Sequence, residues 1–436
     1  MHAPYTGVRF MMRPNGRAFK DERVTIMAFG LTKKELSWVL YDVGNSAFVM
    51  LSTALIPVYF ASIADPGSSV VVAWGYAETV ASLVLALLMP VLGSLADLAG
   101  NKKKFLVGFA GTGAVACAAL GVPEHALAFL VVYVIAAIML NGSMVFYDAF
   151  LVDATTEERY DKVSSHGYAW GYIGSCIPFI ACLAVVLGGS SFGIDAKLGM
   201  KIAFIITAVW WVIFTVPVAK NVKQLHGKKR SDHVLRTTIS GLKGTVKSIM
   251  KDKRLLFFML AFFFYIDGVH TVIKMSTSYG TDLGIDSTQL VLALLVTQFV
   301  AFPSAIAYGN LAKRLGTKRM LKVGVLAYFF IVLFAAFFLK SAVEFWILAI
   351  CVGLFQGGIQ ALSRSEYGKL IPKERANEYY GFFDIFGKYA AVMGTFLVSA
   401  FTQLTGSSSL GVLSIALLFI VGYLFLRAMP PMLGDS

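Results

Sequence analysis

The turn Gly93-Ser-Leu-Ala-Asp97-Leu-Ala-Gly100-Asn-Lys102-Lys103 recurs later in the chain as Gly309-Asn-Leu-Ala-Lys313-Arg-Leu-Gly316-Thr-Lys318-Arg319. The two copies are 216 residues apart (309 − 93), about half of the 436-residue chain. Each copy lies between two long apolar segments. A basic, glycine-framed turn that occurs once in each half indicates two similar membrane bundles joined in sequence, an organisation typical of transporters.

The composition supports a membrane protein. Hydrophobic residues make up 57% of the chain and charged residues only 14%, whereas a soluble domain carries about 25% charge. A spanning helix needs about 20 mostly apolar residues, and twelve segments meet that need: 36–64, 70–92, 104–122, 126–150, 166–189, 200–219, 255–279, 288–311, 321–339, 343–365, 380–404 and 409–427. The sequence therefore predicts an all-α integral membrane protein with twelve transmembrane helices in two six-helix repeats, which are parallel because six is even.

These segments divide the chain into five regions. A basic tail (1–35) precedes the first bundle (36–219), and a basic linker (220–254) joins it to the second bundle (255–427) and a short tail (428–436). Within the linker, 234–252 is basic and amphipathic, which predicts a helix lying on the membrane surface.

The positive charges predict the orientation. With the N-terminus inside, the inside segments hold 32 of the 38 lysines and arginines and the outside loops hold three. Positive residues concentrate on the cytoplasmic side, so both termini are expected there. Topology and attraction to membrane lipids account for the net charge of +13 without a nucleic-acid partner. The short loops favour a bacterial inner (plasma) membrane, with an organelle membrane as the alternative, and we expect a monomer.

Catalytic chemistry is not indicated. The four cysteines lie in apolar segments without metal-type spacing, and His270 is the histidine placed inside a predicted span. We therefore expect no metal, no cofactor and no enzyme activity. No Walker A sequence occurs, so the energy for transport is expected from an ion or substrate gradient, with protons as one candidate.

The 216-residue shift extends beyond the turn, to Glu158-Arg159 and Glu374-Arg375 and to Gly171 and Gly387. With its spacing of two glycines, an acid and basic residues, the first turn resembles the signature of the major facilitator superfamily. The resemblance implies that Gly93, Asp97 and Gly100 belong to a gate, in which Asp97 faces the helix that starts near Asn377–Tyr380. Asn101 stands where the family often has Arg, and Lys313 replaces the acid in the second copy, so only the first turn is expected to act as a latch.

Three further stretches resemble the autophagy-related vacuolar amino-acid effluxer family. They are Ser37-Trp-Val-Leu-Tyr-Asp-Val-Gly-Asn-Ser-Ala-Phe48, Gly357-Gly-Ile-Gln-Ala-Leu-Ser-Arg-Ser365 and Phe382-Phe-Asp-Ile-Phe-Gly-Lys-Tyr-Ala390. Family members often have Trp-Ala in place of Val43-Gly44. The resemblance implies transport of a small molecule, with amino-acid export known in the fungal branch.

Polar side chains inside predicted spans are the candidate site residues, because an ionisable group at a helix centre costs about 2.5–3.5 kcal/mol on insertion scales. In the seventh span, Asp267, His270 and Lys274 share one helical face. The candidates for substrate binding are Asp42, Asn45, Asn141, Asp267, His270, Lys274, Gln356, Gln360 and Lys388.

Other polar residues are assigned to coupling and gating. The candidates for proton coupling are Glu78, Asp148 and Asp267, and the gating candidates besides the turn residues are Arg364, Asp384 and Lys388. Structural roles, such as an internal Asp384–Lys388 ion pair or glutamines that join helices, are left open. The predicted function is secondary active transport of a small polar or zwitterionic solute, most simply amino acids or related metabolites, by alternating access. Export of amphipathic drugs or lipids and a non-transporting receptor are the alternatives.

Overall fold

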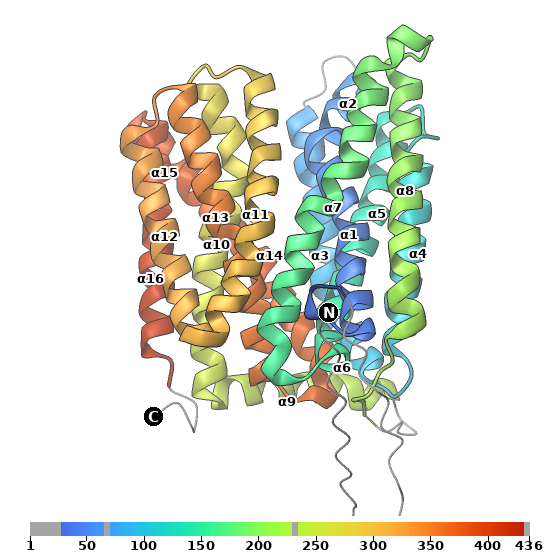
Figure 1. Cartoon of the computed structure of the whole chain (residues 1–436), viewed down its shortest axis with the longest axis vertical. Coiled ribbons are helices and arrows are strands. Elements are labelled where there is room, and N and C mark those ends of the chain that lie inside the picture. Colours follow the sequence, from blue (N-terminus) through green and yellow to red (C-terminus); the bar gives the residue numbers. More distant parts are fainter. Residues whose placement is uncertain (1–27, 65–69, 229–233, 431–436) are drawn as a thin grey trace, which may run out of the picture.

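The computed structural model describes residues 28–64, 70–228 and 234–430 (Figure 1). Most of the predicted N-terminal tail, and the last six residues, therefore lie outside the described residues. The α-helices are α1 (Lys33–Ala54), α2 (Ile56–Ile63), α3 (Val70–Ala96), α4 (Lys102–Ala119), α5 (Ala126–Ala149), α6 (Leu151–Ala154), α7 (Tyr160–Gly188), α8 (Ala196–Asn221), α9 (Val234–Lys251), α10 (Lys253–Asp282), α11 (Ser287–Leu315), α12 (Thr317–Phe338), α13 (Ala342–Leu370), α14 (Ala376–Thr405), α15 (Ser408–Ser414) and α16 (Ala416–Ala428).

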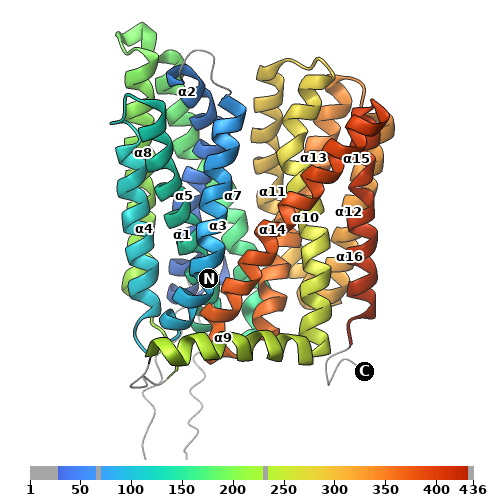
Figure 2. The same ribbon diagram turned by 180° about the vertical axis from the view of Figure 1, so that it is seen from behind.

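The all-helical membrane fold is confirmed. Nine of the described helices are long and apolar enough to cross a membrane, or ten if α1 and α2, which meet at a 45° bend, form one span. The more polar α14 and the shorter α4 lie alongside these helices in both views (Figures 1 and 2). A total of twelve spans stays a prediction.

The helices form two bundles that stand side by side (Figures 1 and 2). The first contains α1 to α8, and the second contains α10 to α16. Helix starts in the two bundles keep the spacing of the repeated turn: α5 and α13 start 216 residues apart (342 − 126), as do α7 and α14 (376 − 160).

The second glycine of each copy of the turn has a positive φ. Gly100 has φ 82° between α3 and α4, and Gly316 has φ 89° between α11 and α12. A side chain at a positive φ is strained, so glycine at these positions allows each helix pair to reverse direction within a few residues.

Contacts between the bundles are very close at the other glycine of each turn. A Cβ on Gly93 would lie 2.6 Å from the carbonyl oxygen of Asn377 at the start of α14, and a Cβ on Gly309 would lie 2.6 Å from Ser165 Oγ in α7. The glycines therefore let α3 approach α14, and α11 approach α7.

Helix α9 lies across the same end of both bundles (Figure 2). Its Thr245 and Ile249 are buried, while Lys243, Lys247 and Lys251 are exposed. Just before it, the backbone of Lys228 pairs with Asp97 and Ala99 in the first turn. We call this side of the molecule the α9 end.

Candidate functional site

A cavity of about 430 Å³ lies between the two bundles. Helices α1, α5 and α7 of the first bundle line it, together with α10, α11, α13 and α14 of the second. Its polar lining residues are Asp42, Asn45, Ser46, Thr53, Asn141, Asp148, Tyr168 and Tyr172 from the first bundle and His270, Gln298, Gln356, Gln360 and Asp384 from the second. Six of the nine substrate-binding candidates thus share one cavity: Asp42, Asn45, Asn141, His270, Gln356 and Gln360.

Aromatic rings make up much of the remaining wall. Phe179 lies on the first bundle, and Phe262 and Phe383 lie on the second. Across the cavity, Gln360 Nε2 donates to the hydroxyl of Tyr172 at 3.4 Å. The cavity therefore offers hydrogen-bonding groups and apolar surface to one small solute.

Arg364 lies beside the carboxylates of Asp42 and Asp148 and is only 1% exposed. Its Nη1 lies 2.9 Å from Asp148 Oδ1 and 3.7 Å from Asp42 Oδ2. Nε and Nη2 donate to the hydroxyl and the carbonyl of Ser164, each at 2.9 Å. Because Arg364 belongs to the second bundle and the other three residues to the first, this cluster joins the bundles.

Three aromatic rings surround the Arg364 guanidinium. Its Cζ lies 4.7 Å from the ring centre of Trp38, 5.3 Å from that of Tyr147 and 4.4 Å from that of Tyr168. Ring faces attract a cation, so they hold the buried charge together with the carboxylates.

A second cavity, of about 650 Å³, adjoins the first and shares Asn141 and Asp384 with it. Glu78 and Lys274, from opposite bundles, both line it. The hydroxyl of Tyr133 donates to Glu78 Oε1. Two candidates thus lie beside the central cavity instead of in it.

Asp267 lies elsewhere. Its side chain is fully buried against α14, where Oδ1 accepts from the amide of Gly394 at 2.9 Å and from Thr271 Oγ1 at 3.2 Å. The residue lines neither of the two cavities described above. Asp267, His270 and Lys274 share one face of α10 but have different surroundings. Asp267 contacts α14, His270 lines the central cavity and Lys274 lines the second cavity.

The side chain of the candidate Lys388 lies outside the described residues, so its position relative to the two cavities is not described. Asp384, one turn earlier on α14, lines both cavities. The expected Asp384–Lys388 pair stays a prediction.

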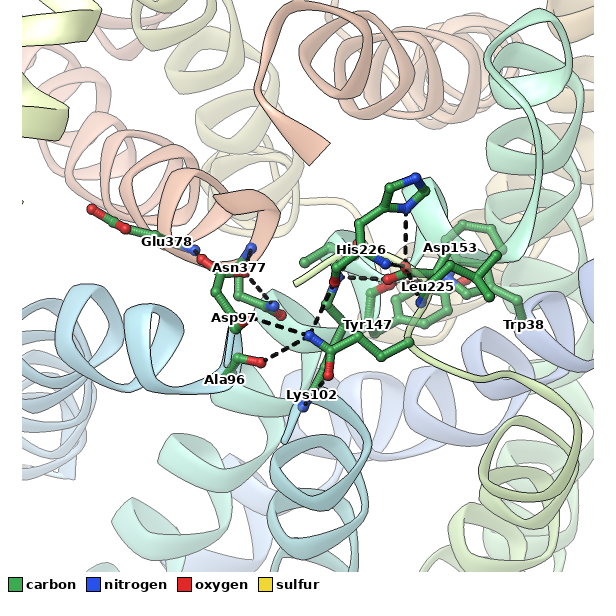
Figure 3. A network of polar contacts seen from close by, with 12 residues as sticks. Trp38, Ala96, Asp97, Lys102, Tyr147, Asp153, Leu225, His226, Asn377 and Glu378 are labelled. Atoms are coloured by element: carbon green, nitrogen blue, oxygen red, sulfur yellow. Dashed lines mark hydrogen bonds and ion pairs between the residues drawn. The ribbon is translucent and has the colours of Figure 1, made fainter. Parts of the chain in front are cut away.

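Asp97 accepts hydrogen bonds from the first turn of α14, as the resemblance implied (Figure 3). Its carboxylate accepts from the amide and the side chain of Asn377, at 2.9 and 2.7 Å, and from the amide of Glu378 at 3.0 Å. The start of a helix favours an anion. Burial nevertheless raises the pKa of Asp97 to about 6, against the opposing effect of Lys102.

A buried ion pair lies close to Asp97 in the same polar network (Figure 3). Lys102 Nζ lies 2.6 Å from Asp153 Oδ2, and both side chains are fully buried. The other carboxylate oxygen of Asp153 accepts from the amides of Leu225 and His226 in the linker, at 2.7 and 2.8 Å (Figure 3). The basic residues of this region predict the orientation of the chain in the membrane. The sequence does not indicate which acids they pair with, because those contacts form only when the linker folds.

The linker also reaches the second bundle. Lys228 Nζ lies 2.6 Å from Glu378 Oε2, and Arg375 Nη2 lies 2.8 Å from Glu378 Oε1. Thr245 of α9 donates to the same carboxylate. The linker thus takes part in holding the two bundles together at the α9 end.

The expectation that only the first turn acts as a latch is wrong. At the second turn, Thr317 Oγ1 donates to Asp161 Oδ2 of α7 at 2.7 Å. Lys369 Nζ lies 2.8 Å from the same oxygen. Lys313 does replace the acid of the first turn, but α7 supplies a carboxylate in its place, so the α9 end has a latch on both sides.

One signal in the sequence could have identified the partner of Arg364. Asp148 and Arg364 are 216 residues apart, the shift that relates the two turns. Equivalent positions in two parallel repeats can meet at the axis between them, and here they carry opposite charges. The aromatic rings around Arg364 have no comparable signal.

Two bundles around a shared polar cavity, joined by ion pairs at one end, define a membrane transporter of the major facilitator type. Solved structures support the fold. The fucose transporter FucP in its outward conformation matches with a TM-score of 0.69 and 13% identity, covering 92% of this chain and 99% of that one. The human organic anion transporter MFSD10 matches with a TM-score of 0.66 and 14% identity, over 90% and 98% of the two chains.

The family follows from sequence. Residues 67–431 match the family model described as vacuole effluxer Atg22 like. An uncharacterized MFS-type transporter, YxiO, of Bacillus subtilis is 45% identical over 92% of this chain and 95% of its own length. Autophagy-related protein 22 of Cryptococcus neoformans is 27% identical over 60% of this chain and 48% of its own length. The chain belongs to the Atg22-like family of major facilitator transporters, which confirms the resemblance.

Proposed function

We propose that the protein is a secondary active transporter of a small polar or zwitterionic solute, with amino acids and related metabolites as the first candidates. The observation that carries this proposal is the central cavity of about 430 Å³, to which both bundles contribute polar side chains. A site shared by two bundles changes its access when they rock against each other. The description of the family as vacuole effluxers supports a small-molecule substrate.

In this proposal, the contacts at the α9 end are the closed gate of alternating access. Asp97, Arg364 and Asp161 each connect the two bundles there. The excess of lysine and arginine in the segments expected inside supports a cytoplasmic α9 end, cytoplasmic termini and twelve spans in two parallel repeats. The homologue from Bacillus subtilis supports a bacterial plasma membrane, and we propose that a monomer suffices.

We further propose proton coupling through Glu78, Asp148 and Asp267. Glu78 lines the second cavity, Asp148 lines the central cavity, and Asp267 is buried between α10 and α14. Protonation of an acid inside a membrane bundle removes a charge that is costly to bury. The three acids therefore offer sites for protonation in three different surroundings.

The test is uptake of radiolabelled amino acids into proteoliposomes, with and without an imposed pH gradient. Transport of at least one amino acid that empty liposomes do not show supports the proposed function. Stimulation by the gradient that is lost in Glu78→Gln, Asp148→Asn or Asp267→Asn supports proton coupling. Uptake that ignores the gradient in the wild type rejects coupling alone, and absence of flux for the whole panel rejects amino acids as substrates.

The aromatic wall formed by Phe179, Phe262 and Phe383 favours one second candidate, an exporter of amphipathic compounds. Competition binding distinguishes the two candidates. Displacement of a bound fluorescent hydrophobic cation by other hydrophobic cations, but by no amino acid, would favour the second.

A further inference from the structure

We propose, on the basis of the transport function above, that Asp148 binds an ammonium group of the substrate, and that this binding breaks the Arg364–Asp148 contact of the gate. The substrates of this site would be amines, including zwitterions that carry an ammonium group. The proposal assigns a binding subsite and its chemistry, and it connects the central cavity to the contact between the bundles.

The charged groups beside the cavity favour binding of a cation. Two carboxylates, Asp42 and Asp148, share the single guanidinium of Arg364. Because one positive charge faces two negative charges, the cluster has a net negative charge when both acids are ionised. Such a cluster attracts a cation, whereas a carboxylate would be repelled by both acids.

The exposure of the three side chains identifies the residue that a ligand can reach. The side chain of Asp148 is 18% exposed, that of Asp42 is 5% exposed and that of Arg364 is 1% exposed. Both acids line the cavity. Asp148 is therefore the most accessible member of the cluster, and Arg364 cannot be reached without displacing its partners.

The surroundings of Asp148 also suit an ammonium group. Asn45, Tyr168 and Tyr172 line the same cavity and provide an amide oxygen, hydroxyl oxygens and ring faces. Oxygens accept hydrogen bonds from an ammonium group, and ring faces attract cations. On the opposite wall, His270 and Asp384 also line the cavity.

An ammonium group and Arg364 would compete for the carboxylate of Asp148. The Arg364–Asp148 contact, at 2.9 Å, joins α13 of the second bundle to α5 of the first. An ammonium group that takes Asp148 leaves Arg364 with Ser164 and with Asp42, which is 3.7 Å away. The closest charged contact at this point of the gate is then lost, so occupation of the cavity favours opening of the α9 end.

The first test compares three ligands of one skeleton on the purified full-length protein by calorimetry at neutral pH. L-Phenylalanine carries both charges, phenethylamine carries only the ammonium group and 3-phenylpropanoate carries only the carboxylate. We expect phenethylamine to bind about tenfold or more tightly than 3-phenylpropanoate, as a charge-assisted hydrogen bond would give. Equal binding of the two, tighter binding of the carboxylate, or no binding of phenethylamine at millimolar concentration overturns the proposal.

Variants sharpen this comparison. Asp148→Asn should remove the preference for the ammonium ligand, whereas Glu124→Gln, in an exposed ion pair with Lys197, should leave it unchanged. The wild-type ligand series remains decisive if the Asp148 variant does not fold. These outcomes are separate from the flux assay, because a protein that transports amino acids but binds the carboxylate ligand as well as the amine retains its proposed function and loses this subsite.

A second readout tests the release of the gate. Glu157 and Lys373 lie 3.5 Å apart across the bundles at the α9 end, and cysteines at both positions allow cross-linking. We expect saturating phenethylamine to slow cross-linking severalfold and 3-phenylpropanoate to leave it unchanged. Cross-linking that phenethylamine leaves unchanged while it binds would overturn the coupling between ligand and gate.

Discussion

Asp148 and Arg364 form an ion pair at 2.9 Å between positions that are 216 residues apart, which is the spacing of the two turns. The pair connects the last residues of α5 to the corresponding part of α13. A charge at one position is therefore neutralised by the opposite charge at the equivalent position of the other bundle. This arrangement closes the α9 end beside the central cavity, and it predicts how the cluster responds to substitution.

Arg364→Gln should destabilise the folded protein strongly. It leaves the buried Asp42 and the partly buried Asp148 without their cation, and removal of one partner of a buried pair costs about 3–5 kcal/mol. Thermal unfolding in detergent measures the change, with Lys197→Gln in an exposed pair as the control. Adding Asp148→Asn to Arg364→Gln should recover part of the loss. Full additivity of the two substitutions would show that the pair is not coupled.

Gly93→Ala and Gly309→Ala should both open the α9 end. The new methyl group would lie 2.6 Å from the backbone oxygen of Asn377 at position 93, and 2.7 Å from Ser165 Cβ at position 309, which rotation of the serine hydroxyl does not relieve. Gly108→Ala is the matched control, because a Cβ there meets nothing within 4 Å. The rate of cross-linking between cysteines at 157 and 373 measures opening. Equal rates in all three variants would contradict the close approach of the helices.

Acidification should favour the closed α9 end through Asp97. Burial raises the pKa of Asp97 from 3.8 to about 6 in the closed arrangement, and opening to water returns it towards 3.8. Between pH 3.8 and 6, the closed form therefore binds more protons than the open form. The stabilisation of the closed form is complete below pH 3.8 and is lost as the pH rises through 6. The full effect is about 3 kcal/mol.

The measurement is the rate of cross-linking between cysteines at positions 157 and 373, from pH 7.5 to pH 5. A control pair of cysteines at positions that do not move relative to each other corrects for the change in thiol ionisation. The neighbouring charged groups are Lys102, Lys228, Arg375 and Glu378. Asp97→Asn should remove the pH dependence and leave those groups in place. A dependence that persists in this variant would assign the effect to another group.

Asp153→Asn should loosen the linker. The carboxylate holds Lys102 and the amides of Leu225 and His226, and the neutral amide of asparagine leaves the buried lysine without a counter-ion. Limited proteolysis within 222–228 should become several times faster. Asp195→Asn is the control, because asparagine also caps a helix such as α8. An unchanged cleavage rate would mean that Asp153 does not hold the linker.

The helical membrane fold follows from local patterns in the sequence, and the first latch follows from the family resemblance that the first turn carries. Long apolar segments specify helices, and the spacing of Gly93, Asp97 and Gly100 specifies a turn. The second latch could not be predicted in the same way, since Asp161 and Thr317 meet only when the bundles pack. Helical periodicity placed Asp267 and His270 on one face, but it does not specify which neighbour each one contacts.

The central claim is that the two bundles move about the shared cavity and that the α9 end is closed in the structure described here. Dipolar electron paramagnetic resonance, continuous-wave for short and pulsed for long distances, between spin labels at positions 157 and 373 tests it most directly, because the native side chains lie 3.5 Å apart at their charged atoms. We predict a short-distance population in the wild type and a second, longer population that grows in Arg364→Gln. A single short distance in both proteins, with substrate and without it, would contradict the account.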